Sequence, residues 1–200
     1  MGIFEIFVKG GLVMYPLLIC SILVVGIGIE RMMYFRKMNT SKEFFAELET
    51  SLEKGDLDSA KTLCQNAQGA VPAMLAGGLS LTTDKDKLEQ LFEAGAMTIA
   101  SRLRYRVNLL DVIVTLSPLL GLLGTVIGMI QSFSVFNLKS GEPMAITGGI
   151  GEALIATATG LCVAIFALVI YSSLNHKIDK LIDQMETAAN EVVLAVMERD

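Results

Sequence analysis

Three long uncharged runs dominate the pattern of hydrophobic and polar positions along this 200-residue chain. They cover residues 10–29, 112–138 and 153–175. About 20 helical residues cross the roughly 30 Å hydrocarbon core of a bilayer, so each run is long enough to span a membrane. The first run exceeds the core of a cleaved signal peptide, about 7–15 residues, and we expect it to be retained. The pattern predicts an all-α integral membrane protein with three transmembrane helices.

Basic residues gather on one side of the three runs, and this bias predicts their orientation. One side carries Arg31, Arg36, Lys37, Lys42, Arg102, Arg104, Arg106, Lys177 and Lys180 near the ends of the runs. The opposite side carries only Lys9 and Lys139. Because cytoplasmic flanks are the basic ones, we expect the N-terminus outside and the C-terminus in the cytoplasm.

The polar segments between the runs show helical periodicity and no strand alternation. A capping signature at 40–43 precedes one helix, and Asp56 can cap the next. Breaks are expected at Gly55, at Gly69 and Pro72 and, more weakly, at Gly77-Gly78. We therefore expect the membrane helices to carry long helical cytoplasmic extensions.

The chain after Gly160 contains neither Gly nor Pro, which allows about 60 Å of unbroken helix at about 1.5 Å per residue. Beyond His176 its apolar residues keep to one stripe, made of Ile178, Leu181, Ile182, Met185, Ala189, Val192, Val193 and Val196. Two compatible explanations stay open for this stripe. It packs against the chain's own cytoplasmic helices, or it forms a contact between subunits.

These patterns divide the chain into seven predicted segments. We expect a short outer or interfacial segment over 1–9, transmembrane helices over 10–29, 108–136 and 149–174, a helical cytoplasmic domain over 30–107, a short periplasmic connection over 137–148, and a cytoplasmic amphipathic helix over 175–200.

Composition removes several other classes of protein. Sixteen Lys plus Arg stand against 21 Asp plus Glu, so no net positive field favours nucleic acid. One His, three scattered Cys and the absence of a phosphate-binding Gly-rich loop argue against metal sites, disulfides and common catalytic centres. We expect no enzyme activity, no metal and no organic cofactor.

Small residues recur three or four apart in the last two runs. They are Gly121, Gly124 and Gly128 in one run and Ala156, Gly160 and Ala164 in the other. Such spacing lets membrane helices approach closely, either within one chain or between chains. Pro118 precedes the first set and is expected to kink its helix.

Thr125 and Thr157 lie on the faces that carry these small residues. Counted from a connection centred near Glu142, the two hydroxyls are expected at similar depth. A lone membrane threonine usually bonds the carbonyl four residues earlier in its own helix. Two threonines at one depth could instead form a polar ring around an axis, and the sequence leaves both roles open.

Glu152 lies at the outer mouth of the third run. An ionisable group at a membrane boundary is costly and suggests a function. The alternative is a charge near a helix N-terminus that the helix dipole favours.

Two stretches that contain these residues resemble the signature of the MotA/TolQ/ExbB proton-channel family. They are SPLLGLLGTVIGMI over 117–130 and GEALIATATGL over 151–161. The segment GGLVMYPL over 10–17 and the pair Glu30-Arg31 fit the ExbB/TolQ branch.

The resemblance implies an ExbB-like stator subunit of a motor driven by the proton-motive force, in the bacterial inner membrane. Family members form a homopentamer around a central pore, and the pore holds a dimer of a single-span ExbD/TolR-like partner with an intramembrane aspartate. Thr125 and Thr157 correspond to the pore-lining threonines, and Glu152 to the acid near the pore mouth. The proton is the coupling ion, and a TonB-like transducer receives the work.

The chain's own residues agree with this on one point. No run has a carboxylate at its middle, and hydroxyls do not titrate near neutral pH, so the proton-binding acid has to come from elsewhere. We expect TonB-dependent outer-membrane transport as the process, with a TolQ-like motor or a gliding or secretion motor as alternatives. A passive membrane scaffold is disfavoured by the paired threonines and by Glu152.

Overall fold

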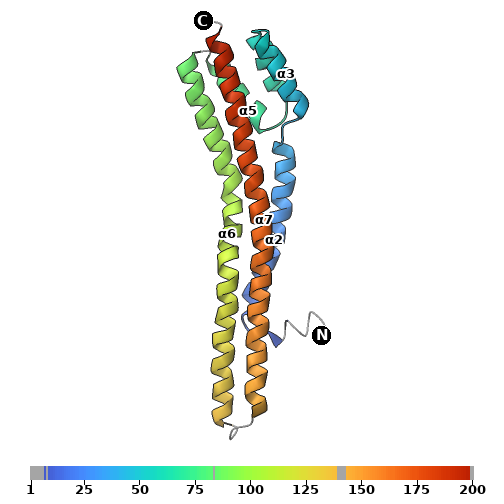
Figure 1. The fold of residues 1–200 in the computed structure, drawn as a ribbon, viewed down its shortest axis with the longest axis vertical. Coiled ribbons are helices and arrows are strands. Elements are labelled where there is room, and N and C mark those ends of the chain that lie inside the picture. Colours follow the sequence, from blue (N-terminus) through green and yellow to red (C-terminus); the bar gives the residue numbers. More distant parts are fainter. Residues whose placement is uncertain (1–6, 8, 83, 139–142, 199–200) are drawn as a thin grey trace. The chain divides into compact units, whose positions relative to one another are not determined.

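The structure, a computed structural model, describes residues 7, 9–82, 84–138 and 143–198 and is built from helices (Figure 1). The helices are α2 (Met14–Met38), α3 (Lys42–Glu53), α4 (Leu57–Asn66), α5 (Ala70–Leu81), α6 (Lys85–Leu138) and α7 (Pro143–Met197). Within the described ranges no residue belongs to a strand, which agrees with the predicted all-α class.

Three of these helices, α2, α6 and α7, are long and apolar enough to cross a membrane, as predicted. The predicted spans 108–136 and 149–174 lie inside α6 and α7, which extend well beyond them. The membrane boundaries themselves stay predictions. Most of the predicted 1–9 segment and residues 139–142 of the predicted connection lie outside the described residues.

The chain forms two compact units. The first contains Met1–Ile29 and Val107–Ser172, and the second contains Glu30–Arg106 and Ser173–Asp200. Each long helix therefore contributes to both units.

In the first unit α6 and α7 pack antiparallel, because Gly160 lies against Ser117 while Gly128 lies against Gly149. Val13, just before α2, and Met14 and Leu17 in its first turn form a buried cluster, against which Phe7, Leu120 and Ile127 pack. Large apolar side chains also point outward, including Leu119, Leu122 and Phe166. Such an outward apolar face is typical of a helix that contacts lipid or another subunit.

In the second unit α3 begins within the expected capping signature at 40–43, and α4 begins at the expected cap, Asp56. The Ser41 hydroxyl accepts a hydrogen bond from the backbone N–H of Phe44 at 3.2 Å. Asp56 accepts one from the backbone N–H of Ser59 at 3.0 Å. Gly55 between the two helices has a φ of 68°, which a glycine adopts without strain. Helix α4 packs against both α3 and α5.

The break expected at Gly77-Gly78 is wrong, since α5 continues through both glycines to Leu81. Gly78 is buried, and a Cβ there would overlap the ring of Phe92 on α6. This glycine permits close helix packing and does not end the helix.

Helix α7 continues without interruption to Met197, as the lack of Gly and Pro predicted. In the apolar stripe Ile178, Met185 and Val192 are fully buried within the chain. The explanation by packing against the chain's own helices is therefore confirmed, while a contact between subunits stays a prediction.

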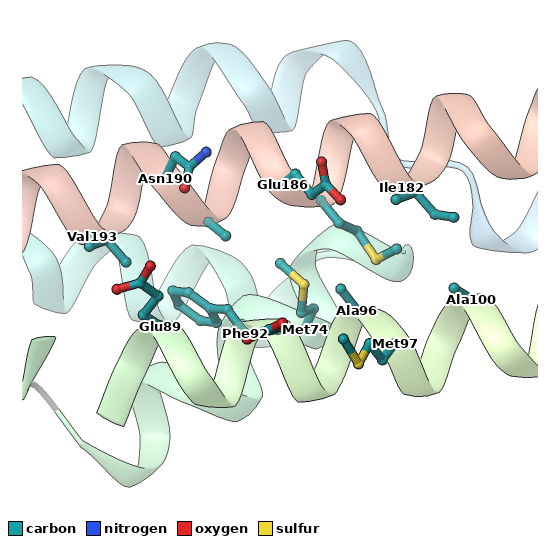
Figure 2. Close-up of a pocket in the computed structure, with 13 residues that line it drawn as sticks. Met74, Glu89, Phe92, Ala96, Met97, Ala100, Ile182, Glu186, Asn190 and Val193 are labelled. Atoms are coloured by element: carbon teal, nitrogen blue, oxygen red, sulfur yellow. The ribbon is translucent and has the colours of Figure 1, made fainter. Parts of the chain in front are cut away.

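Beside this packing lies a cavity of about 480 Å³ with apolar walls (Figure 2). Phe92 and Met97 of α6 and Ile182 of α7 line it, and Glu89 and Glu186 add carboxylates to its lining. It contains none of the site residues predicted from the sequence.

Candidate functional site

Thr157 on α7 forms a hydrogen bond that joins two helices of the first unit. Its hydroxyl donates to the backbone carbonyl of Gly121 on α6 at 3.0 Å and lies 3.3 Å from the carbonyl of Ala153 in its own helix. Gly121 permits this approach, because a Cβ there would lie 3.0 Å from the Thr157 Cα. The Thr157 hydroxyl is thus placed at the α6–α7 interface.

Thr125 on α6 uses its hydroxyl differently. It donates to the carbonyl of Leu122 in its own helix at 2.7 Å. Thr157 lies level with Gly121, which is about one helical turn, roughly 6 Å, from Thr125. The two threonines therefore differ in depth by about one turn and do not lie at the common depth that we expected. The expectation assumed that residues equally far from Glu142 face each other, whereas the packing places Gly128 opposite Gly149.

The predicted small residues meet one another within the chain. A Cβ at Gly124 would lie 2.5 Å from the Ala156 Cβ, and one at Gly128 would lie 3.0 Å from the Ala153 Cβ. A Cβ at Gly160 would lie 2.6 Å from the Ser117 carbonyl oxygen. Ala164 is buried. Packing between α6 and α7 accounts for this spacing, and α6 continues as a helix through Pro118, where the kink stays a prediction.

Two serines extend the hydroxyl-bearing face of α6. Ser132 is buried and donates to the carbonyl of Gly128 at 2.8 Å. Ser117 is fully buried, and its hydroxyl has no hydrogen-bond partner among the described residues. The residues Ser117, Thr157 and Ser132 thus place hydroxyls along the α6–α7 interface, while the Thr125 hydroxyl bonds only within α6. Ser117 could have been selected from the sequence, because Ser117, Gly121 and Thr125 are spaced four residues apart and share one side of the helix.

Glu152 on α7 is partly buried and lies against the turn that precedes α2. A Cβ at Gly11 would overlap the Glu152 carboxylate, and Gly11 has a φ of 71°. The dipole effect is strongest in the first turn of a helix. Helix α7 begins at Pro143, so Glu152 lies well beyond that turn. The dipole of α7 therefore does not explain this acid. Nothing in the sequence pointed to its contact with Gly11.

A cluster of charged side chains surrounds Glu30 in the second unit. In the sequence, Glu30-Arg31 indicates only the resemblance to the ExbB/TolQ branch, and Arg106 indicates only the basic cytoplasmic flank. The Glu30 carboxylate accepts hydrogen bonds from Arg31 at 2.7 Å and pairs with Arg106 at 2.8 Å. These two guanidinium groups, Arg31 foremost, lower the pKa of Glu30 from 4.5 to about 2. Arg31 also lies over the ring of Tyr34, 4.7 Å from its centroid. Asp179 pairs with Arg104 at 3.2 Å.

Comparison with known proteins identifies the family. Residues 65–187 match the family described as the MotA/TolQ/ExbB proton channel family. The chain belongs to this family. The MotA/TolQ/ExbB match together with the three long apolar helices makes it a multi-pass membrane protein. Within the described residues no three His, Cys, Asp or Glu side chains are grouped to hold a metal ion.

Relatives named ExbB and TolQ place the chain in the ExbB/TolQ branch. A Synechocystis protein named as biopolymer transport protein ExbB-like 1 is 35% identical over 200 residues, covering 96% of this chain and 78% of that protein. Biopolymer transport protein exbB1 of Vibrio cholerae is 29% identical over 92% of this chain and 84% of its own length. Tol-Pal system protein TolQ of Haemophilus influenzae is 38% identical over 38% of this chain and 34% of its own length.

Proposed function

We propose that this chain is an ExbB-like stator subunit that couples proton flow across the bacterial inner membrane to work on the cell envelope. Five copies surround a pore, and a dimer of a single-span ExbD/TolR-like partner occupies it. The observation that carries the proposal is the interhelix hydrogen bond of Thr157 on a hydroxyl-bearing face, in a member of a proton-channel family.

The chemistry of the threonines suits this role. Each hydroxyl has one proton to donate and two lone pairs that accept. Thr157 gives its proton to Gly121 and Thr125 gives its proton to Leu122, so both retain acceptor capacity for a water or a protonated carboxyl. Both side chains are only partly buried in the single chain, which leaves them reachable by a partner helix.

The partner supplies the acid in this proposal. A carboxyl on its membrane helix would take up a proton from the outer side and release it to the cytoplasm, while the threonines orient it through hydrogen bonds. Glu152, held against the Gly11 turn, acts near the outer mouth of the pathway. The process powered is TonB-dependent outer-membrane transport, which fits the relatives named biopolymer transport proteins. The similarity to a TolQ protein makes envelope maintenance of the Tol type the second candidate.

Substitution of the threonines tests the proposal. Thr157→Val and Thr125→Val keep the side-chain shape but remove the hydroxyl, and each should lower proton-driven activity roughly tenfold or more, about 1.4 kcal/mol on the barrier. Thr→Ser at either position should retain part of the activity. Glu152→Gln should impair activity while the assembly with the partner remains. The measurement is proton flux in vesicles that contain the chain and its co-purified partner, at matched protein levels.

Thr159 provides a matched control on the same helix. Its hydroxyl donates at 2.8 Å to the carbonyl of Ile155, four residues earlier, so Thr159→Val removes only a hydrogen bond within the helix. We expect wild-type flux from this variant. Wild-type flux from both Thr125→Val and Thr157→Val would overturn the pathway assignment and favour a passive scaffold.

A further inference from the structure

A cavity of about 360 Å³ in the second unit lies between α2 and α7 and is lined by three cationic side chains. Arg36 comes from α2, and Lys177 and Lys180 come from α7. No Asp or Glu is among the described residues that line it. The cavity therefore concentrates positive charge in a chain whose net charge is −5.

Two of the carboxylates near these cations in sequence are engaged by other arginines, and Asp183, which follows Lys180 by three residues, does not line the cavity. Glu30 pairs with Arg31 and Arg106, and Asp179 pairs with Arg104. The Lys177 ammonium instead lies 3.0 Å from the thioether sulfur of Met32, which is a weak acceptor. An anionic oxygen is a far better partner for an ammonium than a thioether, so the cavity is set up for an anion.

The cavity also has an apolar wall and two amides. Met32, Phe35 and Leu181 form the wall, and Asn39 and Gln184 complete the lining. Met33, next to this wall in sequence, is exposed. A free inorganic anion has no apolar part that could contact such a wall. A phospholipid has a phosphate joined to a glycerol ester and apolar acyl chains, which could contact the cations and the wall at once.

The depth of the three cations fits a lipid headgroup. Lys177 and Lys180 follow the predicted end of the third span at residue 174 by three and six residues, and Arg36 follows residue 29 by seven. At about 1.5 Å per residue all three lie within about 10 Å of the hydrocarbon, where the headgroup region begins. Basic pockets between helices on the cytoplasmic side of a membrane are known to take anionic headgroups.

We propose that this cavity binds the headgroup of an anionic phospholipid from the cytoplasmic leaflet. Arg36, Lys177 and Lys180 hold the phosphate and any further anionic group, and Met32, Phe35 and Leu181 contact the start of the acyl chains. The proposal rests on the membrane placement and predicted orientation of the chain. It does not depend on the proton pathway.

Lipid binding by the full-length chain tests the site. Detergent-purified, delipidated protein is titrated with phosphatidylglycerol, with phosphatidylcholine and with inorganic phosphate, and bound lipid is counted by native mass spectrometry. The triple variant Arg36→Gln, Lys177→Gln, Lys180→Gln is compared with a matched variant Lys37→Gln, Lys42→Gln, Lys54→Gln. The matched variant removes the same charge from exposed positions outside the cavity, and Lys37 is the neighbour of Arg36.

We expect the wild type and the matched variant to bind phosphatidylglycerol at least tenfold more tightly than phosphatidylcholine, and the cavity variant to lose that preference. Lys177→Arg keeps the charge and should retain binding, which separates the site from an effect on folding. Equal binding of phosphatidylglycerol by the cavity variant would overturn the proposal. So would equal binding of phosphatidylcholine, or inorganic phosphate that displaces the lipid at equal concentration. Proton flux plays no part in these outcomes, so failure of the pathway assignment is seen separately.

Discussion

Glu30 is the acid with the strongest charged partners in the second unit, since it contacts arginines of two helices. Arg31 is its neighbour on α2, and Arg106 reaches it from α6. Arg31 is nearly buried, while the Glu30 side chain is 37% exposed. A pair this exposed is screened by solvent, so its contribution to stability is about 1 kcal/mol, well below what the pKa shift alone would suggest.

We predict that Glu30→Gln lowers the melting temperature at neutral pH and that the difference from wild type disappears in acid. The pKa of Glu30 is lowered from 4.5 to about 2, so the stabilisation is complete above about pH 4.5 and is lost as the pH falls toward 2. Thermal melts of the detergent-purified chain between pH 2.5 and 7 measure it, with the exposed Glu53→Gln as the control. A pH-independent difference would show that the amide acts through packing.

At the same scale, the candidate residues can be picked out from the sequence, but their contacts cannot. Thr125 and Thr157 share their faces with small residues, and this follows from helical spacing alone. The bond from Thr157 to Gly121 depends on the register between two helices, which the length of the connection does not determine. The contact of Glu152 with Gly11 joins positions 141 residues apart and has no local signal.

At the scale of helices, the elements whose ends are set by neighbouring residues can be predicted from the sequence. Ser41 and Asp56 cap α3 and α4 through side chains within three residues, so the sequence carries the whole signal. The break expected at Gly78 is wrong because the reason for this glycine lies in α6, where the Phe92 ring occupies the space that a side chain would need. A glycine pair has the same local pattern whether it ends a helix or lets one pack closely.

The two glycines of α5 give a paired prediction. Gly77 is exposed, and a Cβ added there would meet nothing within 4 Å, so Gly77→Ala should stabilise the protein by about 0.5–1 kcal/mol through helix propensity. Gly78→Ala should destabilise it by about 1–3 kcal/mol, because the methyl group overlaps the buried Phe92 ring. Melting temperatures of the two variants check the sign of each change. Equal effects would contradict the proposed packing role of Gly78.

At the scale of the whole molecule, the sequence predicts the number of apolar helices, while the number of chains comes from family resemblance. Packing of α6 on α7 uses the small residues within the chain, so these give no count of subunits. The outward apolar side chains Leu119 and Leu122, 57% and 58% exposed, suit either lipid or a neighbouring chain. Lipid and a neighbouring membrane helix are both apolar, so the same outward side chains serve either environment.

We predict that the chain purified in mild detergent is a pentamer. Native mass spectrometry measures this directly, and co-expression with a single-span partner should add two copies of that partner to the complex. Only monomers or dimers over a range of mild detergents would contradict the prediction. The cavity variant of Arg36, Lys177 and Lys180 then shows whether assembly depends on bound lipid.

The turn at Gly11 restricts which residues position 11 can accept in evolution. Residue 11 has two separate reasons to be glycine, a φ of 71° and the carboxylate of Glu152 in the place of a side chain. Shortening the acid would relieve the overlap but not the left-handed backbone, which costs most other residues about 1–2 kcal/mol. A lineage that loses this glycine therefore cannot recover by one compensating change at position 152. Position 11 should therefore remain glycine even in relatives that carry another residue at position 152.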